Sequence, residues 1–201
     1  AGNQSLPTYS GVNEVSYSDN WVYIRTTGLG HHIMGPWYRD ELDTQLFGNF
    51  PANIAAIYRF PRTPSGASSD YNITTGGAIG YFIDGVALFD ARDAFSYINN
   101  LGIDGTPNGN NGRGDGIWNR DAYENESITF DSANAHQASD TYHYHANPPA
   151  LRYLLDDHVD YNSISNTYSE KITSPANHSP IIGWVSDGYP IYGPYGYSDT
   201  T

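Results

Sequence analysis

The chain contains no cysteine, which excludes a disulfide framework, a zinc–thiolate site and a thiol nucleophile. Lysine is nearly missing as well, because Lys171 is the only one, and 9 Lys and Arg face 22 Asp and Glu for a net charge of -13. So acidic a chain is poorly suited to nucleic acid or to an anionic membrane surface, and we expect neither as a partner. No apolar run approaches the roughly 18 residues that cross a bilayer, so we expect no membrane insertion.

Several catalytic signatures are also missing. The chain has no G-x-S-x-G, no P-loop and no H-E-x-x-H. Its carboxylates are plentiful, but no pair has the spacing or context of a glycosidase acid and base. The sequence therefore does not point to any of these enzyme classes.

Tyrosine, by contrast, is abundant, with 18 residues among 201. A Tyr-rich, Lys-poor composition is typical of extracellular β proteins, and we expect an extracellular or periplasmic location. A start at Ala1 suits a mature form after removal of a signal peptide, and equally a partial chain. The length is sufficient to bury a core without disulfides.

Short β-type runs separated by turn residues follow one another along most of the chain. No long amphipathic helical pattern appears, and short helices are expected only over 91–98 and 150–155. We expect a mainly β, single-domain fold, a β-sandwich or distorted barrel of short antiparallel strands with long loops and one or two short helices. Residues 1–19 are expected to form a polar N-terminal segment, and 20–201 the domain.

Two segments resemble each other, residues 79–89 and 182–192. Each consists of an apolar run, an Asp-Gly pair and a second apolar run, which predicts a hairpin. An internal duplication would pack the two hairpins about a pseudo-two-fold axis. A chance likeness between two ordinary hairpins is the alternative.

The sharpest chemical feature is Tyr142-His143-Tyr144-His145. In a β-strand both imidazoles lie on one face and both tyrosines on the other. His136 precedes His143 by seven residues, and a turn between them can fold it back onto the strand. Imidazoles without thiolate favour Cu(II), Zn(II), Ni(II) or Fe(II) over calcium and magnesium, and we expect copper or zinc. The alternative is a structural strand with hydrogen-bonded histidines.

Further donors could complete such a site. His178 is the next candidate ligand, and Asp187 could ligate or could orient an imidazole. His31 and His32 rank after them, and only one of these two can face a given pocket. A Gly-rich loop over 104–116 carries oxygen donors that suit calcium, although their spacing does not match an EF-hand and a plain flexible insertion is the alternative. These donors are Asp104, Asn108, Asn110 and Asp115.

Several ordered motifs resemble the YHYH-domain family, which is named for its tetrapeptide. Besides residues 142–145 they include Phe130-Asp131, His136 and the blocks 30–35, 77–80, 178–184 and 187–194, so that the resemblance covers most of 20–197. It implies a secreted or surface protein of a poorly characterised bacterial family, with metal binding, often imagined as copper, inferred from the histidines. Relatives often carry cysteines near the motif, which this chain lacks. Some continue past the Gly-Pro segment, so part of the fold or site is expected beyond Thr201.

The favoured function is an extracytoplasmic metal-binding protein with a site built from His136, His143, His145 and His178. A structural or adhesive surface protein is the first alternative, for instance a subunit of an extracellular filament that calcium stabilises. There the tyrosines would fill interfaces between copies, because their rings suit contacts that are apolar at one end and wet at the other. A metal-dependent hydrolase or oxidase is the second alternative.

Overall fold

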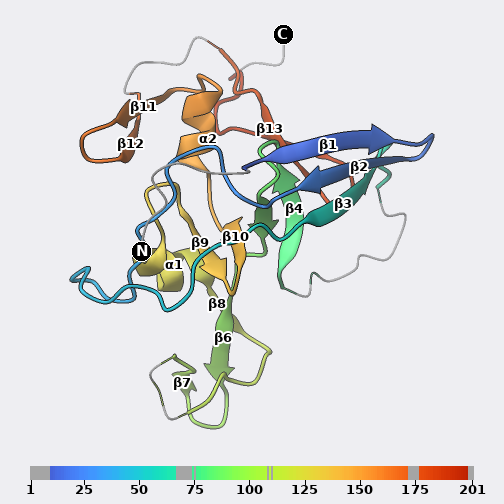
Figure 1. Ribbon diagram of the computed structural model, residues 1–201. Coiled ribbons are helices and arrows are strands. Elements are labelled where there is room, and N and C mark those ends of the chain that lie inside the picture. Colours follow the sequence, from blue (N-terminus) through green and yellow to red (C-terminus); the bar gives the residue numbers. More distant parts are fainter. Residues whose placement is uncertain are drawn as a thin grey trace.

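A six-stranded sheet forms the centre of the computed structural model, which describes residues 10–66, 74, 76–107, 109, 111–171 and 177–198 (Figure 1). The strand order is β14-β13-β4-β5-β10-β9. Every neighbouring pair is antiparallel except β10 and β5, which run parallel. The strands are β4 (Ala78–Phe82), β5 (Ala87–Phe89), β9 (Ala135–Ala138), β10 (Thr141–Tyr144), β13 (Ile181–Val185) and β14 (Pro190–Tyr192).

The two predicted hairpins lie side by side in this sheet and supply four neighbouring strands, from β14 at one edge to β5. Trp184 of β13 pairs with Tyr81 of β4, its counterpart in the other hairpin, so the pairing follows a local two-fold axis. A Cβ on Gly80 would lie 2.8 Å from the carbonyl oxygen of Trp184, and one on Gly183 would lie 2.6 Å from that of Tyr81. Glycine occurs at both equivalent positions because the strand opposite approaches too closely for a side chain. The expected pseudo-two-fold packing is therefore observed.

A three-stranded sheet packs against the first and makes the fold a sandwich. It consists of β1 (Val12–Tyr17), β2 (Trp21–Thr26) and β3 (Ala56–Pro61) in that order. Phe60 of β3 stacks on Trp184, with ring centroids 5.6 Å apart, and Tyr58 stacks on Tyr81 at 3.6 Å. β1 lies inside the segment 1–19, and its pairing with β2 joins residues 12–17 to the domain. No closed barrel is present among the described residues.

A narrow arm projects from the sandwich, at the bottom of Figure 1. It is formed by β6 (Arg92–Ile98), flanked by β7 (Ile103–Asp104) and β8 (Asn119–Asp121). The helix predicted over 91–98 is therefore wrong. Extended pairing with β7 and β8 satisfies the backbone there, and long-range pairing of this kind overrides local helix propensity.

Helices are short and lie next to the sheets. α1 (Ala122–Glu126) follows the arm and continues into a 3-10 turn, Ser127–Thr129, and α2 (Pro149–Leu154) follows the central motif as predicted. A hairpin of β11 (Val159–Asn162) and β12 (Thr167–Glu170) comes next, joined to α2 by the buried Arg152. None of the helices in the described part of the chain has the length and hydropathy needed to cross a membrane.

The hydrophobic core lies on the tyrosine face of β10. Tyr142 and Tyr144 are fully buried there beside Trp37, Met34 and Phe82. Their hydroxyls donate to the buried carboxylates of Asp131 and Asp84, at 2.8 and 3.2 Å. The two tyrosines therefore anchor β10 from behind and leave its other face to the histidines.

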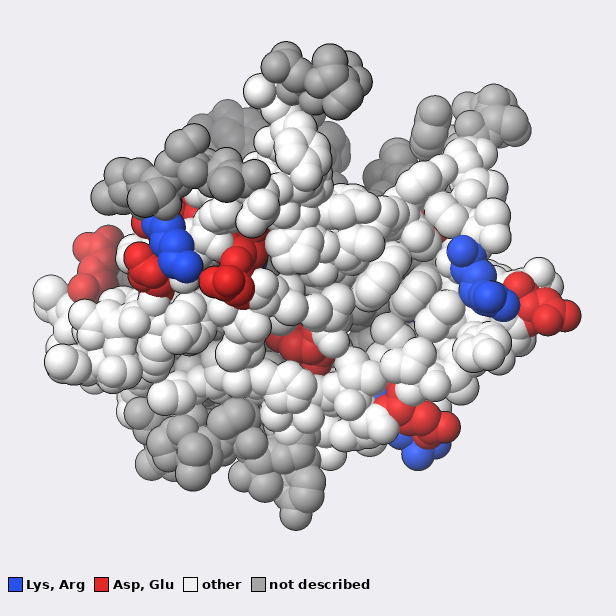
Figure 2. Space-filling view, turned by 90° about the horizontal axis from the view of Figure 1, so that it is seen from above, with Lys and Arg blue, Asp and Glu red and all other residues white. Residues whose placement is uncertain are grey.

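Acidic side chains are dispersed on the face that Figure 2 shows, which is the upper side of Figure 1. They occur there in small separate groups, several of them next to a basic side chain. An exposed ion pair such as Arg25–Glu14 contributes about 0–1 kcal/mol. The net charge of -13 is thus not concentrated on this face.

Candidate metal centre

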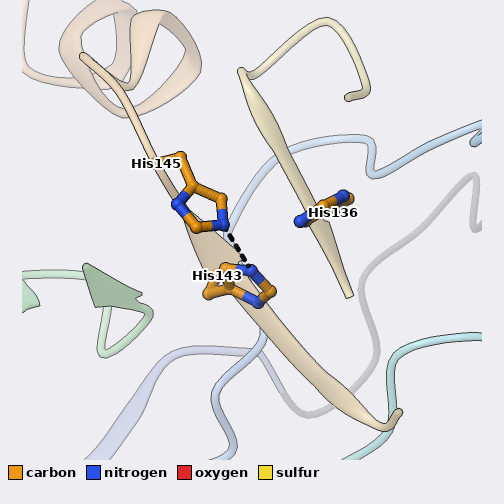
Figure 3. A group of neighbouring side chains, drawn as sticks. All are labelled: His136, His143 and His145. Carbon is orange, nitrogen blue, oxygen red and sulfur yellow. Dashed lines mark hydrogen bonds between the residues drawn. The ribbon is translucent and has the colours of Figure 1, made fainter. Parts of the chain in front are cut away.

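β10 is held on both sides, by β5 and by β9, and this fixes the direction of its side chains. His143 and His145 project to the face opposite the core tyrosines, as the strand period requires. His136 of β9 is the direct cross-strand partner of His143. The predicted turn between them is present, and all three imidazoles point toward one another (Figure 3).

The ligand atoms that the three side chains offer lie within 4.8 Å of one another. The Nε2 atoms of His143 and His145 are 3.0 Å apart. The Oε2 atom of Glu126, the last residue of α1, lies 3.3 Å from Nε2 of His136 and 3.5 Å from Nε2 of His145. The three nitrogens therefore converge on one point, and the carboxylate oxygen of Glu126 lies beside two of them.

The other nitrogen of each ring determines which tautomer is present. Nδ1 of His143 lies 3.0 Å from the carbonyl oxygen of Thr141, and Nδ1 of His145 lies 3.1 Å from that of Asp90. A carbonyl oxygen can only accept, so both Nδ1 atoms carry the proton. Nδ1 of His136 lies 2.7 Å from Thr129 Oγ1.

Thr129 fixes the third ring in the same way. Its hydroxyl donates to the carbonyl oxygen of Glu126 at 2.6 Å and has no second proton to give. His136 must therefore donate from Nδ1 to this hydroxyl. In its neutral form each of the three rings presents an Nε2 lone pair to the common point, with Nδ1 bound to an orienting oxygen, as in protein metal sites.

This arrangement suits a cation. Two lone pairs at 3.0 Å repel each other, and so do a carboxylate oxygen and a lone pair at 3.3 Å. A metal ion or a proton among these atoms removes the repulsion. Metal–nitrogen bonds of about 2.0–2.1 Å give ligand separations of about 3.3–3.4 Å in a tetrahedron. The separations of 3.0, 3.3 and 3.5 Å given above are close to this value, and the residues present thus fit a metal ion.

Burial keeps the histidines available as ligands. It lowers the pKa of His143 to about 3, with the neighbouring imidazole of His136 as the next cause, and it also lowers the pKa of His145. Both rings are therefore neutral at pH 7. Phe89 stacks on His143 at 3.8 Å and Phe130 lies parallel to His145 at 5.8 Å, so that aromatic rings cover this centre.

Glu126 is positioned from behind by a second carboxyl group. Burial alone would raise the pKa of Glu126, but hydrogen bonds with His136 and Asp93 outweigh it and lower the pKa to about 2. Asp93 is buried, its pKa is raised by burial and by Glu126, and Arg120 holds it at 2.6 Å. The arm thus supplies Asp93 and Arg120, which hold the carboxylate at the histidines.

The centre opens on one side into a cavity of about 940 Å³. The three histidines and Glu126 line this cavity, together with Phe89, Phe95 and Arg120. The arm strands β6 and β8 form one side of this space. A molecule in the cavity would therefore reach the convergence point of the ligand atoms.

The remaining predicted ligands lie elsewhere, and the expected four-histidine site is corrected here. His178 packs against Tyr192 of β14, at the edge of the sheet opposite β9. Asp187 is exposed at the tip of the β13–β14 hairpin. His31 is exposed, whereas His32 is buried on the core side, where its Nε2 lies 2.9 Å from the hydroxyl of Tyr142. Residues on the wrong face or the wrong edge cannot reach the cluster.

The calcium-loop residues do not form a second group in the part of the chain that is described. Asp104 is exposed in β7, and Asp115 accepts hydrogen bonds from the backbone and side chain of Asn99, at 2.8 and 2.9 Å. Asn108 and Asn110 lie outside the described residues. Among the described residues, His136, His143 and His145 are the one group of three such donors.

Sequence reasoning missed Glu126, because it expected no helix over residues 122–126. A signal was available in Asp121-x-x-Glu124, the pattern that begins a helix. Asp121 caps α1 by accepting from the backbone N–H of Glu124 at 2.9 Å. The helix and the following 3-10 turn carry Glu126 and Thr129 to the histidines.

Residues 57–201 match the sequence pattern of the YHYH protein family. No curated protein matches the chain, and no solved structure matches it. The family match covers more than half of the chain and includes every residue of the convergent group. The chain therefore belongs to the YHYH protein family, as the resemblance of its motifs indicated.

Proposed function

We propose that this member of the YHYH family binds a divalent transition metal through Nε2 of His136, His143 and His145, with Glu126 as the fourth donor. The observation that carries the proposal is the set of three Nδ1–H hydrogen bonds, which direct three lone pairs to one point. If the histidines had only a structural role, their three Nδ1 atoms would not all need to donate to an oxygen and leave Nε2 free. The role of the YHYH tyrosines is then to anchor β10 from the core side.

The donor set also bears on the identity of the metal. Imidazole and carboxylate ligands without sulfur suit Cu(II) and Zn(II), and calcium and magnesium prefer sites built from oxygen alone. Affinity at a fixed site rises along the first-row metals to copper, so we propose Cu(II) as the tightest ligand and zinc as the next. The acidic, Tyr-rich and Lys-poor composition supports a location outside the cytoplasm.

A metal-dependent hydrolase or oxidase is the second candidate, because the centre lines a cavity of about 940 Å³. A metal at such a centre supplies Lewis-acid chemistry and, if it is copper, redox chemistry. Catalysis requires an open coordination position, which Glu126 occupies when it ligates. The chain's own residues would orient a bound molecule through Arg120 and the phenyl rings of Phe89 and Phe95.

Elemental analysis of protein purified without chelator tests the proposal. The wild-type chain should carry a stoichiometric transition metal, and the double variant His143→Ala, His145→Ala should carry none. His178→Ala is the matched control, since His178 lies outside the cluster and its loss should leave the metal content unchanged. A wild-type protein that holds only calcium, or no metal after exposure to copper and zinc, contradicts the proposal.

A further inference from the structure

The cavity beside the histidines has basic and aromatic walls, although the chain as a whole is strongly acidic. Its volume of about 940 Å³ lies within the range of roughly 300–1,000 Å³ that is typical of small-molecule sites, and an inorganic ion would leave most of it empty. Three of the eight arginines and three phenyl rings line it: Arg39, Arg92, Arg120, Phe47, Phe89 and Phe95. These side chains indicate which kind of organic molecule the cavity accepts.

The arginines come from two different segments. Arg92 and Arg120 belong to β6 and β8 of the arm. Arg39 lies in the loop that begins after Tyr38, and Phe47 at the other end of this loop packs edge-on against His136, with ring centroids 6.2 Å apart. A molecule in the cavity would therefore meet guanidinium groups from both segments, with the histidines beside it.

Two of the three arginines have a carboxylate partner. Nε of Arg92 lies 2.8 Å from Oδ1 of Asp90, and Nη2 of Arg120 lies 2.6 Å from Oδ2 of Asp93. Arg39 is exposed and forms no ion pair within the described part of the chain. Its guanidinium group is thus available to a ligand.

A divalent metal would decide the sign of the charge in this space. The three guanidinium groups are matched by three carboxyl groups, those of Asp90, Asp93 and Glu126, so that their formal charges cancel. Among the described lining residues, Asp93 and Glu126 are the only acidic ones. A metal ion at the histidines therefore adds two positive charges that no further carboxylate of the wall offsets, and the metal-loaded cavity favours an anion.

The phenyl rings favour a flat apolar body next to that anionic group. Phe89 stacks on His143 at 3.8 Å, and the guanidinium carbons of Arg113 and Arg120 lie 5.9 and 5.7 Å from the centre of the Phe95 ring. Both phenyl rings are only partly buried, so part of each is left for contact with a ligand. Contacts between aromatic rings contribute about 0.5–1.5 kcal/mol beyond the burial of their area.

We propose that the cavity binds an aromatic carboxylate, with the charged group beside the metal and the arginines and the ring against the phenyl side chains. Anion binding of this kind rests on the metal binding proposed above, because the metal supplies the net positive charge. The two binding events are then linked. An anion that prefers the metal-loaded protein by a given factor must raise the metal affinity by the same factor.

Isothermal titration calorimetry of the zinc-loaded protein with three matched probes tests this ligand class. Benzoate carries both the charge and the ring, benzamide lacks the charge, and acetate lacks the ring. Benzoate should bind at least about tenfold more tightly than benzamide and about fivefold more tightly than acetate. Protein stripped of metal by a chelator should bind benzoate at least about tenfold more weakly, and benzoate should raise the zinc affinity by the same factor.

Arg39→Gln separates the wall of the cavity from the metal centre. Benzoate affinity should fall about fivefold, whereas zinc content should not change, since Arg39 is not one of the metal donors. Arg25→Gln is the matched control, because Arg25 is an exposed arginine of β2 outside the cavity, and it should alter neither quantity. In Phe95→Leu the preference for benzoate over acetate should decrease.

Three outcomes overturn the aromatic carboxylate and leave the metal site standing. A zinc-loaded protein that binds benzamide as tightly as benzoate, or that binds neither, has no site for an organic anion. Phosphate that binds as tightly as benzoate shows a site for inorganic anions instead. Equal benzoate affinity with and without zinc excludes the linkage. A chain that takes up no metal, by contrast, contradicts the proposed function itself, and elemental analysis detects this separately.

Discussion

Replacing Glu126 with glutamine tests whether this carboxylate is the fourth donor of the metal centre. The change keeps the size of the side chain and removes its charge. Oε2 lies 3.3 and 3.5 Å from two of the nitrogen donors, which are the ligand separations of a tetrahedral site. An amide in its place keeps a weak donor but loses the attraction between opposite charges. We expect metal affinity to fall by about 10–100-fold, or about 1.4–2.8 kcal/mol.

Competition against a chromophoric chelator measures this affinity for both copper and zinc. Glu124→Gln is the matched control, because Glu124 lies on the same helix but is exposed to solvent. That variant should bind metal as the wild type does. If Glu126→Gln also binds as tightly as the wild type, the carboxylate is not a ligand, the fourth position is open, and the reasoning from the donor geometry is refuted.

Further predictions concern the positioning of the site, the packing of the hairpins and the effect of pH. Thr129→Val should lower metal affinity about 10-fold in the same assay, since one ring loses the acceptor that fixes its tautomer, and an unchanged affinity would contradict this role. Gly183→Ala should lower the free energy of unfolding in urea by about 1–3 kcal/mol, because the new Cβ would lie 2.6 Å from the facing carbonyl oxygen of β4. Gly48→Ala is the control: its Cβ meets no atom within 4 Å, and the free energy of unfolding should change by less than about 0.5 kcal/mol. Burial raises the pKa of Asp84 to about 6, so the protonated carboxyl stabilises the fold below pH 4 and this stabilisation is lost as the pH rises through about 6. In Asp84→Asn the free energy of unfolding should therefore fall by up to roughly 3 kcal/mol less between pH 4 and pH 7 than in the wild type. The same pH dependence in both proteins would refute this.

The central pair of hairpins was predictable because local signals agreed with the tertiary contacts. An Asp-Gly turn between apolar runs specifies a hairpin by itself. The glycines at equivalent positions, Gly80 and Gly183, indicate in addition that another backbone comes close, and each hairpin provides that backbone for the other. The arm was not predictable in this way. Residues 91–98 resemble a short helix in isolation, and only their pairing with β7 and β8 makes them a strand.

Part of the metal centre was contained in the sequence for a simple reason. His143 lies on β10 and His145 directly follows its last residue, so their common face follows from the two-residue period of extended backbone. His136 follows nearly as directly, because a tight turn between adjacent strands brings it to the position opposite His143. These three residues needed no contact from the rest of the chain to be predicted together.

Tertiary structure alone decided the rest of the donor set. His178 and His32 resemble the site histidines in sequence, yet one lies at the far edge of the sheet and the other on the core face of β10. Glu126 replaces them because a short capped helix, reached through the arm, ends beside the cluster. Positions along one strand are related by a fixed period, whereas positions on separate elements are related only by packing. The sequence therefore determined the histidine pair and its near neighbour, and the fold determined which carboxylate lies beside them.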